Sequence, residues 1–173
     1  GNIVKIFHDP SDRVGYWEGR ITPMAGATLL ATCWAHGWSS DRDLPNHYSL
    51  SHDGGMSWGA PLASPVMGQT GWPLWLGDAQ IAFVYNRRQD PVGVRAQIAK
   101  ISAERWDTVF DAEVWTPENR AASSISKNDY AVTGFQFGAP SAIRLDEGHV
   151  MVVYWCVENA RAGINWSMMA LRW

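Results

Sequence analysis

The octapeptide SHDGGMSW, from Ser51 to Trp58, carries the clearest fold signal in the chain. The residues just before it, NHYSLS, alternate between polar and apolar, as a β-strand with one buried face does. Asp53-Gly54-Gly55 then favours a turn, because glycine accepts positive φ angles and an aspartate carboxylate accepts hydrogen bonds from nearby backbone N–H groups. We therefore predict a hairpin turn that packs on itself; the alternative is a surface turn with an incidental tryptophan. The positions that define the self-packed turn are Ser51, Asp53, Gly55, Ser57 and Trp58.

The composition is that of an ordinary globular domain. The 173 residues are 46% hydrophobic and only 18% charged, which is enough for one domain, 1–173, with a real core. The net charge of −3 gives no electrostatic reason to expect nucleic acid binding, and no basic run indicates a membrane surface. No apolar stretch approaches the roughly 20 residues that span a bilayer, and the first residues, GNIVKIFHDP, lack the pattern of a signal peptide. These observations assign no compartment.

The two cysteines, Cys33 and Cys156, lie inside apolar runs, where a cysteine usually packs as a small hydrophobic residue. The chain has no C-x-x-C pair and no H-E-x-x-H motif. We therefore predict no metal site and no bound cofactor.

A unit of strands recurs three times along the chain. Its core is an apolar run, TLLATCWAH, QIAFVYNRR or HVMVVYWCV, in which Leu29, Ile81 and Val150 occupy equivalent positions. Each run follows a turn and a strand-like segment, and another strand follows each run. No apolar stripe with the 3.6-residue period of a helix is present at helical length. Short antiparallel strands in fours with tight turns are typical of propeller blades, so the predicted fold is all-β, a β-propeller with about three blades in the chain.

The predicted blades divide the single domain along its length. Blade 1 covers 14–66, blade 2 covers 69–116 and blade 3 covers 135–173, with a Ser/Asn/Ala-rich long loop over 117–134. Blade 3 ends after three strands, and the strand-like segment NIVKIF at 2–7 is expected to close it as an outer strand. Three blades leave two apolar faces open, whereas propellers close with about four to eight blades. We therefore expect a homodimer that closes a six-bladed ring; the alternatives are half of a longer protein and a compact three-bladed structure.

SHDGGMSW resembles the Asp-box, S-x-D-x-G-x-[ST]-W, of sialidases and related six-bladed propellers, and it matches every defined position. The segments YWEGRITPMAGATLLATCW, GQTGWPLWLGDAQIAFVYNRR and FGAPSAIRLDEGHVMVVYW are similar to consecutive blades of the same sialidase-like class of Asp-box, or BNR, repeat proteins. Together these segments cover most of the chain. The resemblance implies a six-bladed propeller with the Asp-box on its outer rim, and it implies a glycoside hydrolase that acts on an acidic sugar.

The resemblance also implies candidate catalytic residues. Arg20 lies in RITP, which resembles the R-I-P motif of the first carboxylate-binding arginine in sialidases, with one residue inserted. Asp43 lies in the loop where that family carries its acid/base aspartate, and Asp41 is the other carboxylate there. Glu18 follows two aromatic residues on a candidate inner strand, where its carboxylate would face the central channel. The family's paired tyrosine and glutamate, and its full arginine triad, cannot be assigned in this chain.

Candidate substrate-binding residues come from strands near the predicted ring axis. They are Trp17, Gln69, Trp72 and Arg88. Aromatic rings stack on the apolar faces of sugars, and planar polar side chains bind their hydroxyl groups, so a carbohydrate ligand is expected. The alternative is that these aromatic and polar side chains only fill a narrow channel.

Two functional hypotheses stay open. The first is a sialidase-related glycoside hydrolase, and the second is a non-catalytic propeller that binds carbohydrate or protein or serves as an assembly module.

Overall fold

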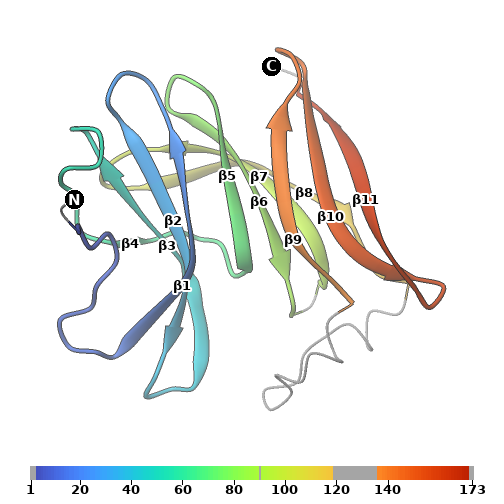
Figure 1. Cartoon of the computed structure of the whole chain (residues 1–173), viewed down its shortest axis with the longest axis horizontal. Coiled ribbons are helices and arrows are strands. Elements are labelled where there is room, and N and C mark those ends of the chain that lie inside the picture. Colours follow the sequence, from blue (N-terminus) through green and yellow to red (C-terminus); the bar gives the residue numbers. More distant parts are fainter. Residues whose placement is uncertain (1–2, 90, 119–135, 172–173) are drawn as a thin grey trace.

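The computed structural model describes residues 3–89, 91–118 and 136–171, and every regular element in them is a β-strand (Figure 1). The first sheet contains β1 (Val14–Pro23), β2 (Leu29–Gly37), β3 (Arg42–Ser51) and β4 (Leu62–Ala63). The middle sheet contains β5 (Gln69–Gly77), β6 (Gln80–Arg87), β7 (Gly93–Ile101) and β8 (Trp106–Trp115). The third sheet contains β9 (Phe137–Arg144), β10 (His149–Glu158) and β11 (Arg161–Ala170).

All neighbouring strands pair antiparallel, and each sheet keeps its strands in chain order. The prediction of an all-β chain of antiparallel sheets with three or four strands each is therefore confirmed. Most of the predicted long loop 117–134 lies outside the described residues, as do residue 135 and residues 172–173 of the predicted blade 3. Among the described residues, no helix has the length and hydropathy needed to cross a membrane.

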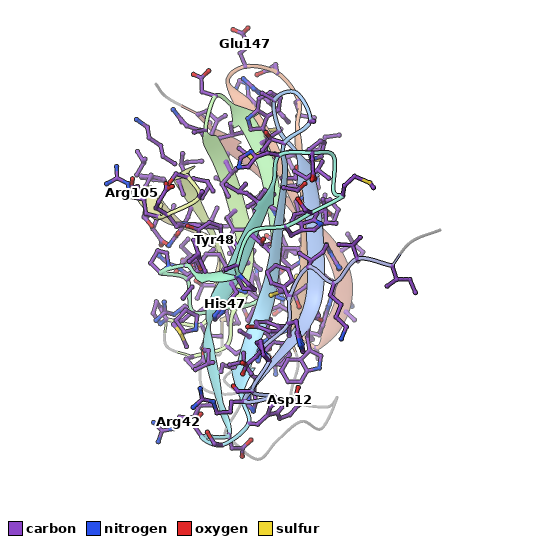
Figure 2. The ribbon with its side chains drawn as sticks, turned by 90° about the vertical axis from the view of Figure 1, so that its left-hand side faces the viewer. Asp12, Arg42, His47, Tyr48, Arg105 and Glu147 are labelled. Carbon is purple, nitrogen blue, oxygen red and sulfur yellow. The ribbon has the colours of Figure 1, made fainter. Side chains whose placement is uncertain are left out.

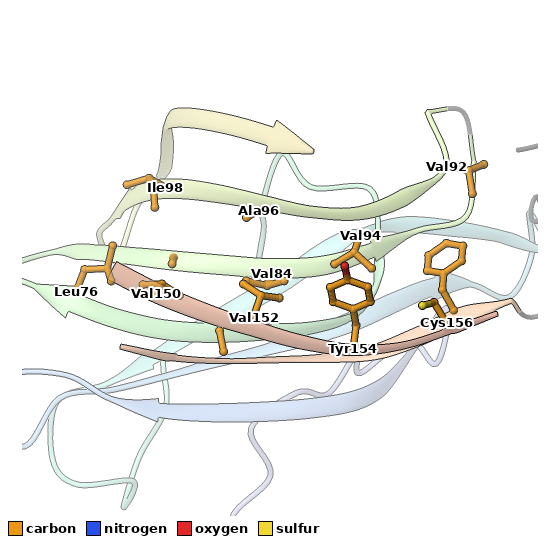
Figure 3. Packing of buried hydrophobic residues seen from close by; sticks show 13 residues of the cluster. Leu76, Val84, Val92, Val94, Ala96, Ile98, Val150, Val152, Tyr154 and Cys156 are labelled. Atoms are coloured by element: carbon orange, nitrogen blue, oxygen red, sulfur yellow. The ribbon is translucent and has the colours of Figure 1, made fainter. Parts of the chain in front are cut away.

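The middle sheet packs against a neighbouring sheet on each of its faces. On β6, Ile81, Phe83 and Tyr85 belong to the buried cluster shared with the first sheet. The alternate residues Ala82 and Val84 belong to the cluster shared with the third sheet (Figure 3). Successive side chains of a strand point to opposite faces, so a strand buried on both faces needs a continuous apolar run. This requirement explains why the β6 sequence shows no polar alternation.

The first sheet packs on the middle sheet through aromatic side chains. Tyr48, labelled on β3 in Figure 2, meets Trp106 edge-on, with 5.5 Å between the ring centroids. Its neighbour His47 lies on the opposite face of β3 and meets the ring of Tyr16 at 5.5 Å. One face of the first sheet therefore belongs to the core, and the other faces away from the middle sheet.

Both cysteines are buried and form no disulfide. Burial raises the pKa of Cys33 to about 12, because the thiolate is poorly solvated in an apolar environment. Cys156 belongs to the cluster between the middle and third sheets. The prediction that both residues serve packing is confirmed.

The segment SHDGGMSW forms a turn that is closed by its own side chains. The Ser51 hydroxyl donates to Asp53 Oδ1 at 2.8 Å and accepts the Gly55 N–H at 2.8 Å. Ser57 donates its N–H to Asp53 Oδ1 at 2.9 Å and its hydroxyl to Oδ2 at 2.6 Å. Gly54 and Gly55 have φ angles of +72° and +92°, a region that favours glycine. Asp53 is thus the centre of a local hydrogen-bond network that fixes the turn.

Acid is expected to remove the contribution of Asp53 to stability. Its hydrogen bonds with Ser57 and Ser51 lower its pKa from 3.8 to about 2, so the folded state favours the ionised carboxylate. This contribution is complete above about pH 4 and disappears as the pH falls towards 2. The difference in melting temperature between the wild type and Asp53→Asn should therefore shrink between pH 6 and pH 2, measured by scanning calorimetry. A difference that does not change with pH would contradict this role.

Residues 3–7 form no strand, which differs from the prediction that 2–7 close the third sheet; residue 2 lies outside the described residues. Phe7 instead contacts Tyr16 of the first sheet, with ring centroids 5.6 Å apart. The cause is the order of the sheets. The N-terminal segment lies beside the first sheet, at the opposite end of the row from β11 (Figure 1). A single copy of the chain cannot bring the two edges together.

Candidate functional site

A β-bulge interrupts the first strand of every sheet at an equivalent place. The register of β1 shifts between Trp17 and Arg20, and that of β5 shifts between Gln69 and Gly71. The pairing of β10 with β9 shifts between Val153 and Trp155. A bulge bends its strand and redirects a side chain, and bulges are common beside functional sites.

Each bulge contains a residue other than glycine with a positive φ angle. These residues are Glu18 at +52°, Thr70 at +42° and Ala139 at +45°. Such conformations cost about 1–3 kcal/mol each and concentrate at ligand sites, where the surrounding structure holds them. The same costly conformation recurs in all three sheets, so the place where the three bulges meet is the candidate ligand site.

The three bulges line one pocket of about 300 Å³. Its lining combines two tryptophans, two arginines, one carboxylate, two amides and a hydroxyl. The residues are Glu18, Arg20, Trp34, Gln69, Thr70, Asn86, Arg88, Gly138, Ala139 and Trp155. We call this cavity the central pocket, since β1, β5 and β9 all contribute to it.

Two buried polar groups in the wall of the central pocket lack hydrogen bonds. Asn86 is completely buried, and neither its side-chain nitrogen nor its oxygen has a partner in the described part of the chain. The indole nitrogen of Trp34 is also buried without a partner there. Leaving a buried polar group unpaired costs about 1–3 kcal/mol. A polar ligand in the pocket would supply the missing partners.

Two arginines place positive charge at the central pocket. Arg88 is only 5% exposed, and its guanidinium lies 4.2 Å from the centre of the Phe137 ring. Burial lowers the pKa of Arg88 to about 10, and the nearby charge of Glu18 acts in the opposite direction. Arg88 therefore stays protonated at neutral pH. Arg20 lies 5.9 Å from the centre of the Trp72 ring, close enough for a cation–π interaction.

Gly138 lets a tryptophan and an arginine approach each other in the pocket wall. A Cβ atom at this position would lie 2.8 Å from Trp155 Nε1 and 3.2 Å from Arg88 Nη2. Any larger residue would therefore displace the indole or the guanidinium. On the other side of the pocket, the Thr70 hydroxyl donates to Glu18 Oε2, which joins the bulges of β1 and β5.

Asp43 lies behind the pocket lining instead of in it. Its Oδ2 accepts a hydrogen bond from Gln69 Nε2 at 3.0 Å, and its Oδ1 lies 3.2 Å from His36 Nδ1. The Asp43 side chain is 16% exposed. His36 also approaches Asp41, with Nε2 3.4 Å from Oδ1. Asp43 therefore reaches the pocket through Gln69, which it orients.

The structure brings together only some of the sequence candidates. Glu18, Arg20, Gln69 and Arg88 line the central pocket. Trp17 supports the wall from behind by packing on Trp34, with ring centroids 5.0 Å apart. Trp72 packs against the buried cluster between the middle and third sheets and contacts the pocket through Arg20.

Sequence reasoning missed three equivalent residues of the central pocket. Trp34, Asn86 and Trp155 each stand five residues after an aligned position of the apolar runs. Each is paired across the ladder with a residue beside the bulge, as in the pairs Trp17–Trp34 and Gln69–Asn86. The alignment of the three repeats could have identified these residues, because a polar or bulky aromatic residue interrupts each apolar run at this same position.

Within residues 3–89, 91–118 and 136–171, no group of three or more His, Cys, Asp or Glu side chains is arranged to hold a metal ion. The central pocket accordingly offers arginines, amides and indoles to a ligand.

Comparisons with known proteins establish the fold alone. The chain is similar to a protein of unknown function from Dyadobacter fermentans, with a TM-score of 0.66 and 22% identity over 93% of this chain and 40% of the other. It is also similar to a family 117 glycoside hydrolase of the marine bacterium Zobellia galactanivorans, with a TM-score of 0.58 and 11% identity over 98% of this chain and 57% of the other. The chain thus spans about half the length of these structures. No protein-family model matches the sequence, and no curated protein matches it significantly.

Proposed function

We propose that the central pocket binds an acidic carbohydrate. The observation that carries this proposal is the buried amide of Asn86, which lies beside two tryptophans and has no hydrogen-bond partner in the described part of the chain. Sugar hydroxyl groups donate and accept hydrogen bonds, so a single sugar can satisfy both atoms of an amide. Indole rings suit the apolar faces of a sugar ring. The likeness to a glycoside hydrolase agrees with a carbohydrate-related role.

The charges in the pocket favour an acidic sugar over a neutral one. Arg20 and Arg88 outnumber Glu18, the one carboxylate of the lining. A guanidinium binds a carboxylate with two parallel hydrogen bonds, and the interaction is stronger where water is excluded, as it is around Arg88. A carboxylate on the sugar would therefore find its partner at the buried end of the pocket.

We also propose that the three sheets are successive blades of a sialidase-like Asp-box propeller. The first strands support this arrangement, because β5 contacts both β1 and β9 while the strands that follow lead away from the pocket. In such a ring, the first strands surround the axis and the ligand site lies there. The turn from Ser51 to Trp58 then belongs to the outer rim and has a structural role.

Glycoside hydrolysis is the second candidate function. It is favoured by the carboxylate of Glu18 in the pocket and by Asp43, which His36 and Gln69 hold in place. Carboxyl groups supply the acid and base of most such enzymes. In this candidate function, Arg20 anchors the acidic substituent, Glu18 performs proton transfer in the pocket, and Asp43 acts through Gln69, which it orients. The alternative is a non-catalytic module that binds carbohydrate or protein.

Calorimetric titration with uronic acid and sialic acid saccharides, each against its neutral counterpart, tests the binding proposal. The acidic ligand should bind about 10-fold more tightly or better, because a charged hydrogen bond contributes about 1.5–3 kcal/mol. No binding of any acidic saccharide would overturn the proposal.

Fluorogenic sialosides and uronides then distinguish a glycoside hydrolase from a non-catalytic binding module. Turnover that is lost in Asp43→Ala and Glu18→Gln, with folding verified by circular dichroism, supports the hydrolase, and binding without turnover supports the non-catalytic module.

A further inference from the structure

One face of the third sheet is apolar and open to solvent. Four of its side chains, Ile143, Met168, Trp166 and Ile164, are 45–71% exposed. The register places them next to one another across β9, β10 and β11. The face is completed along β10 by Met151, Val153 and Trp155. Monomeric proteins rarely expose a contiguous apolar patch of this kind without a partner. We call it the open face.

The open face is equivalent to faces that are covered in the other two sheets. In the alignment of the three repeats, Met151 corresponds to Leu30 of the first sheet and Ala82 of the middle sheet. Leu30 and Ala82 are completely buried against the next sheet in the row. Among the described residues, no further sheet follows the third one in the row. By this equivalence, the surface that fits the open face is another sheet of the same kind.

A strand is also missing at the same end of the molecule. The third sheet has three strands where the others have four, so the outer edge of β11 pairs with no strand of the described chain. Residues 3–7 form no strand, and Ile3 and Val4 are 97% and 42% exposed. An exposed apolar segment and an exposed sheet edge are the two components of strand addition. They lie at opposite ends of the row of sheets (Figure 1), so they can meet only between two molecules.

We propose that a second copy of this chain covers the open face. Residues 3–7 of each copy pair with β11 of the other as a fourth strand, and the outward face of each first sheet packs on the open face of the other. On that outward face Ile21 is 53% exposed, whereas Ala31 and Cys33 on the neighbouring strand β2 are already buried within one copy. Ile21 is therefore the apolar side chain that this face offers to Trp166 and Met168 of the other copy. The two contacts are identical, so the assembly closes as a two-fold dimer of six sheets.

The dimer would also complete the central pocket, and this part of the inference rests on the proposed function. Trp155 belongs both to the open face and to the pocket lining. A sheet that covers the open face therefore covers the indole of Trp155 on its exposed side. Ligand bound against Trp155 would then be enclosed by residues of both copies.

Light scattering after size exclusion tests the dimer directly. The wild type should have twice the 19.3 kDa mass of one chain, and Trp166→Glu should be a monomer. Ile3→Pro should weaken the dimer about 10-fold or more, because proline cannot donate to a strand ladder. Since Ile3 is 97% exposed, its replacement leaves the fold of each copy intact. Met56→Glu, at a 68% exposed residue of the Ser51–Trp58 turn, is the matched control and should stay dimeric.

A monomeric wild type, or an open-ended series of oligomers, overturns the inference. An Ile3→Pro protein whose dissociation constant is unchanged overturns the exchange of residues 3–7. The titrations of the proposed function are read separately. A monomer that binds the acidic sugar overturns this inference alone, and a dimer that binds no sugar overturns only the proposed function.

Discussion

Replacing Asn86 with leucine is expected to stabilise the protein and to abolish binding of the acidic sugar. Both polar atoms of the Asn86 side chain are buried in the pocket wall, and neither has a hydrogen-bond partner among the residues that the structure describes. Leucine has a similar size and no polar atoms, so it removes this cost from the folded state. We expect a gain of about 1–2 kcal/mol, or roughly 2–8 °C in melting temperature for a chain of this length. Affinity for the sugar should fall about 10-fold or more, because the ligand's hydroxyl groups lose their partners.

Asn46 provides the matched control for this experiment. It is also buried on a strand, but its side-chain nitrogen donates to the Cys33 carbonyl at 3.1 Å, and only its side-chain oxygen lacks a partner among the described residues. The same substitution, Asn46→Leu, breaks a bond within the protein and should lower the melting temperature while leaving sugar affinity unchanged. The two variants thus shift the melting temperature in opposite directions, and only Asn86→Leu loses affinity for the sugar. An Asn86→Leu protein that is destabilised and still binds would show that the amide serves the fold.

The strand positions were predictable from sequence because burial imposes a period on each strand. The three apolar runs correspond to β2, β6 and β10, which lie at the centre of their sheets. Turn chemistry located the turn from Ser51 to Trp58, since its hydrogen bonds join residues at most four positions apart. Local interactions of this kind are visible in a single sequence.

The bulges were not predictable because their residues give no local signal. Glu18, Thr70 and Ala139 all have positive φ angles, yet none is glycine or asparagine. Their conformations are imposed by the packing of three sheets around one pocket, which involves contacts distant in sequence. For the same reason, the interaction of Asp43 with Gln69, 26 positions away, could not be derived. Sequence reasoning found the three charged residues of the pocket lining, Glu18, Arg20 and Arg88, but not the contacts that hold them in place.

The position of residues 3–7 shows another limit of a single sequence. Their apolar pattern predicts a strand, and the third sheet lacks one, so the pairing was a natural expectation. Sequence pattern indicates which segments form strands but not whether partners belong to the same molecule. Only the order of the sheets in space shows that one chain cannot make this pair.

Replacing Arg88 with lysine is expected to weaken binding of the acidic sugar about 10- to 100-fold while changing affinity for its neutral counterpart less than about 2-fold. Lysine keeps a positive charge but lacks the planar fork that binds both oxygens of a carboxylate. It also loses the flat contact that the guanidinium makes with the Phe137 ring at 4.2 Å. The neutral ligand reports that the pocket is still formed. Arg105→Lys, at an exposed arginine paired with Asp107, is the control and should bind both ligands as the wild type does.

The pH dependence of the Arg88→Lys protein provides a second, independent measurement. The burial that lowers the pKa of Arg88 to about 10 must also lower the pKa of a lysine at this position. The lysine therefore loses its proton, and with it the attraction for a carboxylate, as the pH rises through that lowered value. Affinity of Arg88→Lys for the acidic sugar should fall between pH 6 and pH 9, whereas wild-type affinity should stay constant because its arginine remains charged. Equal losses for acidic and neutral ligands at every pH would mean that Arg88 shapes the pocket and does not bind the acid.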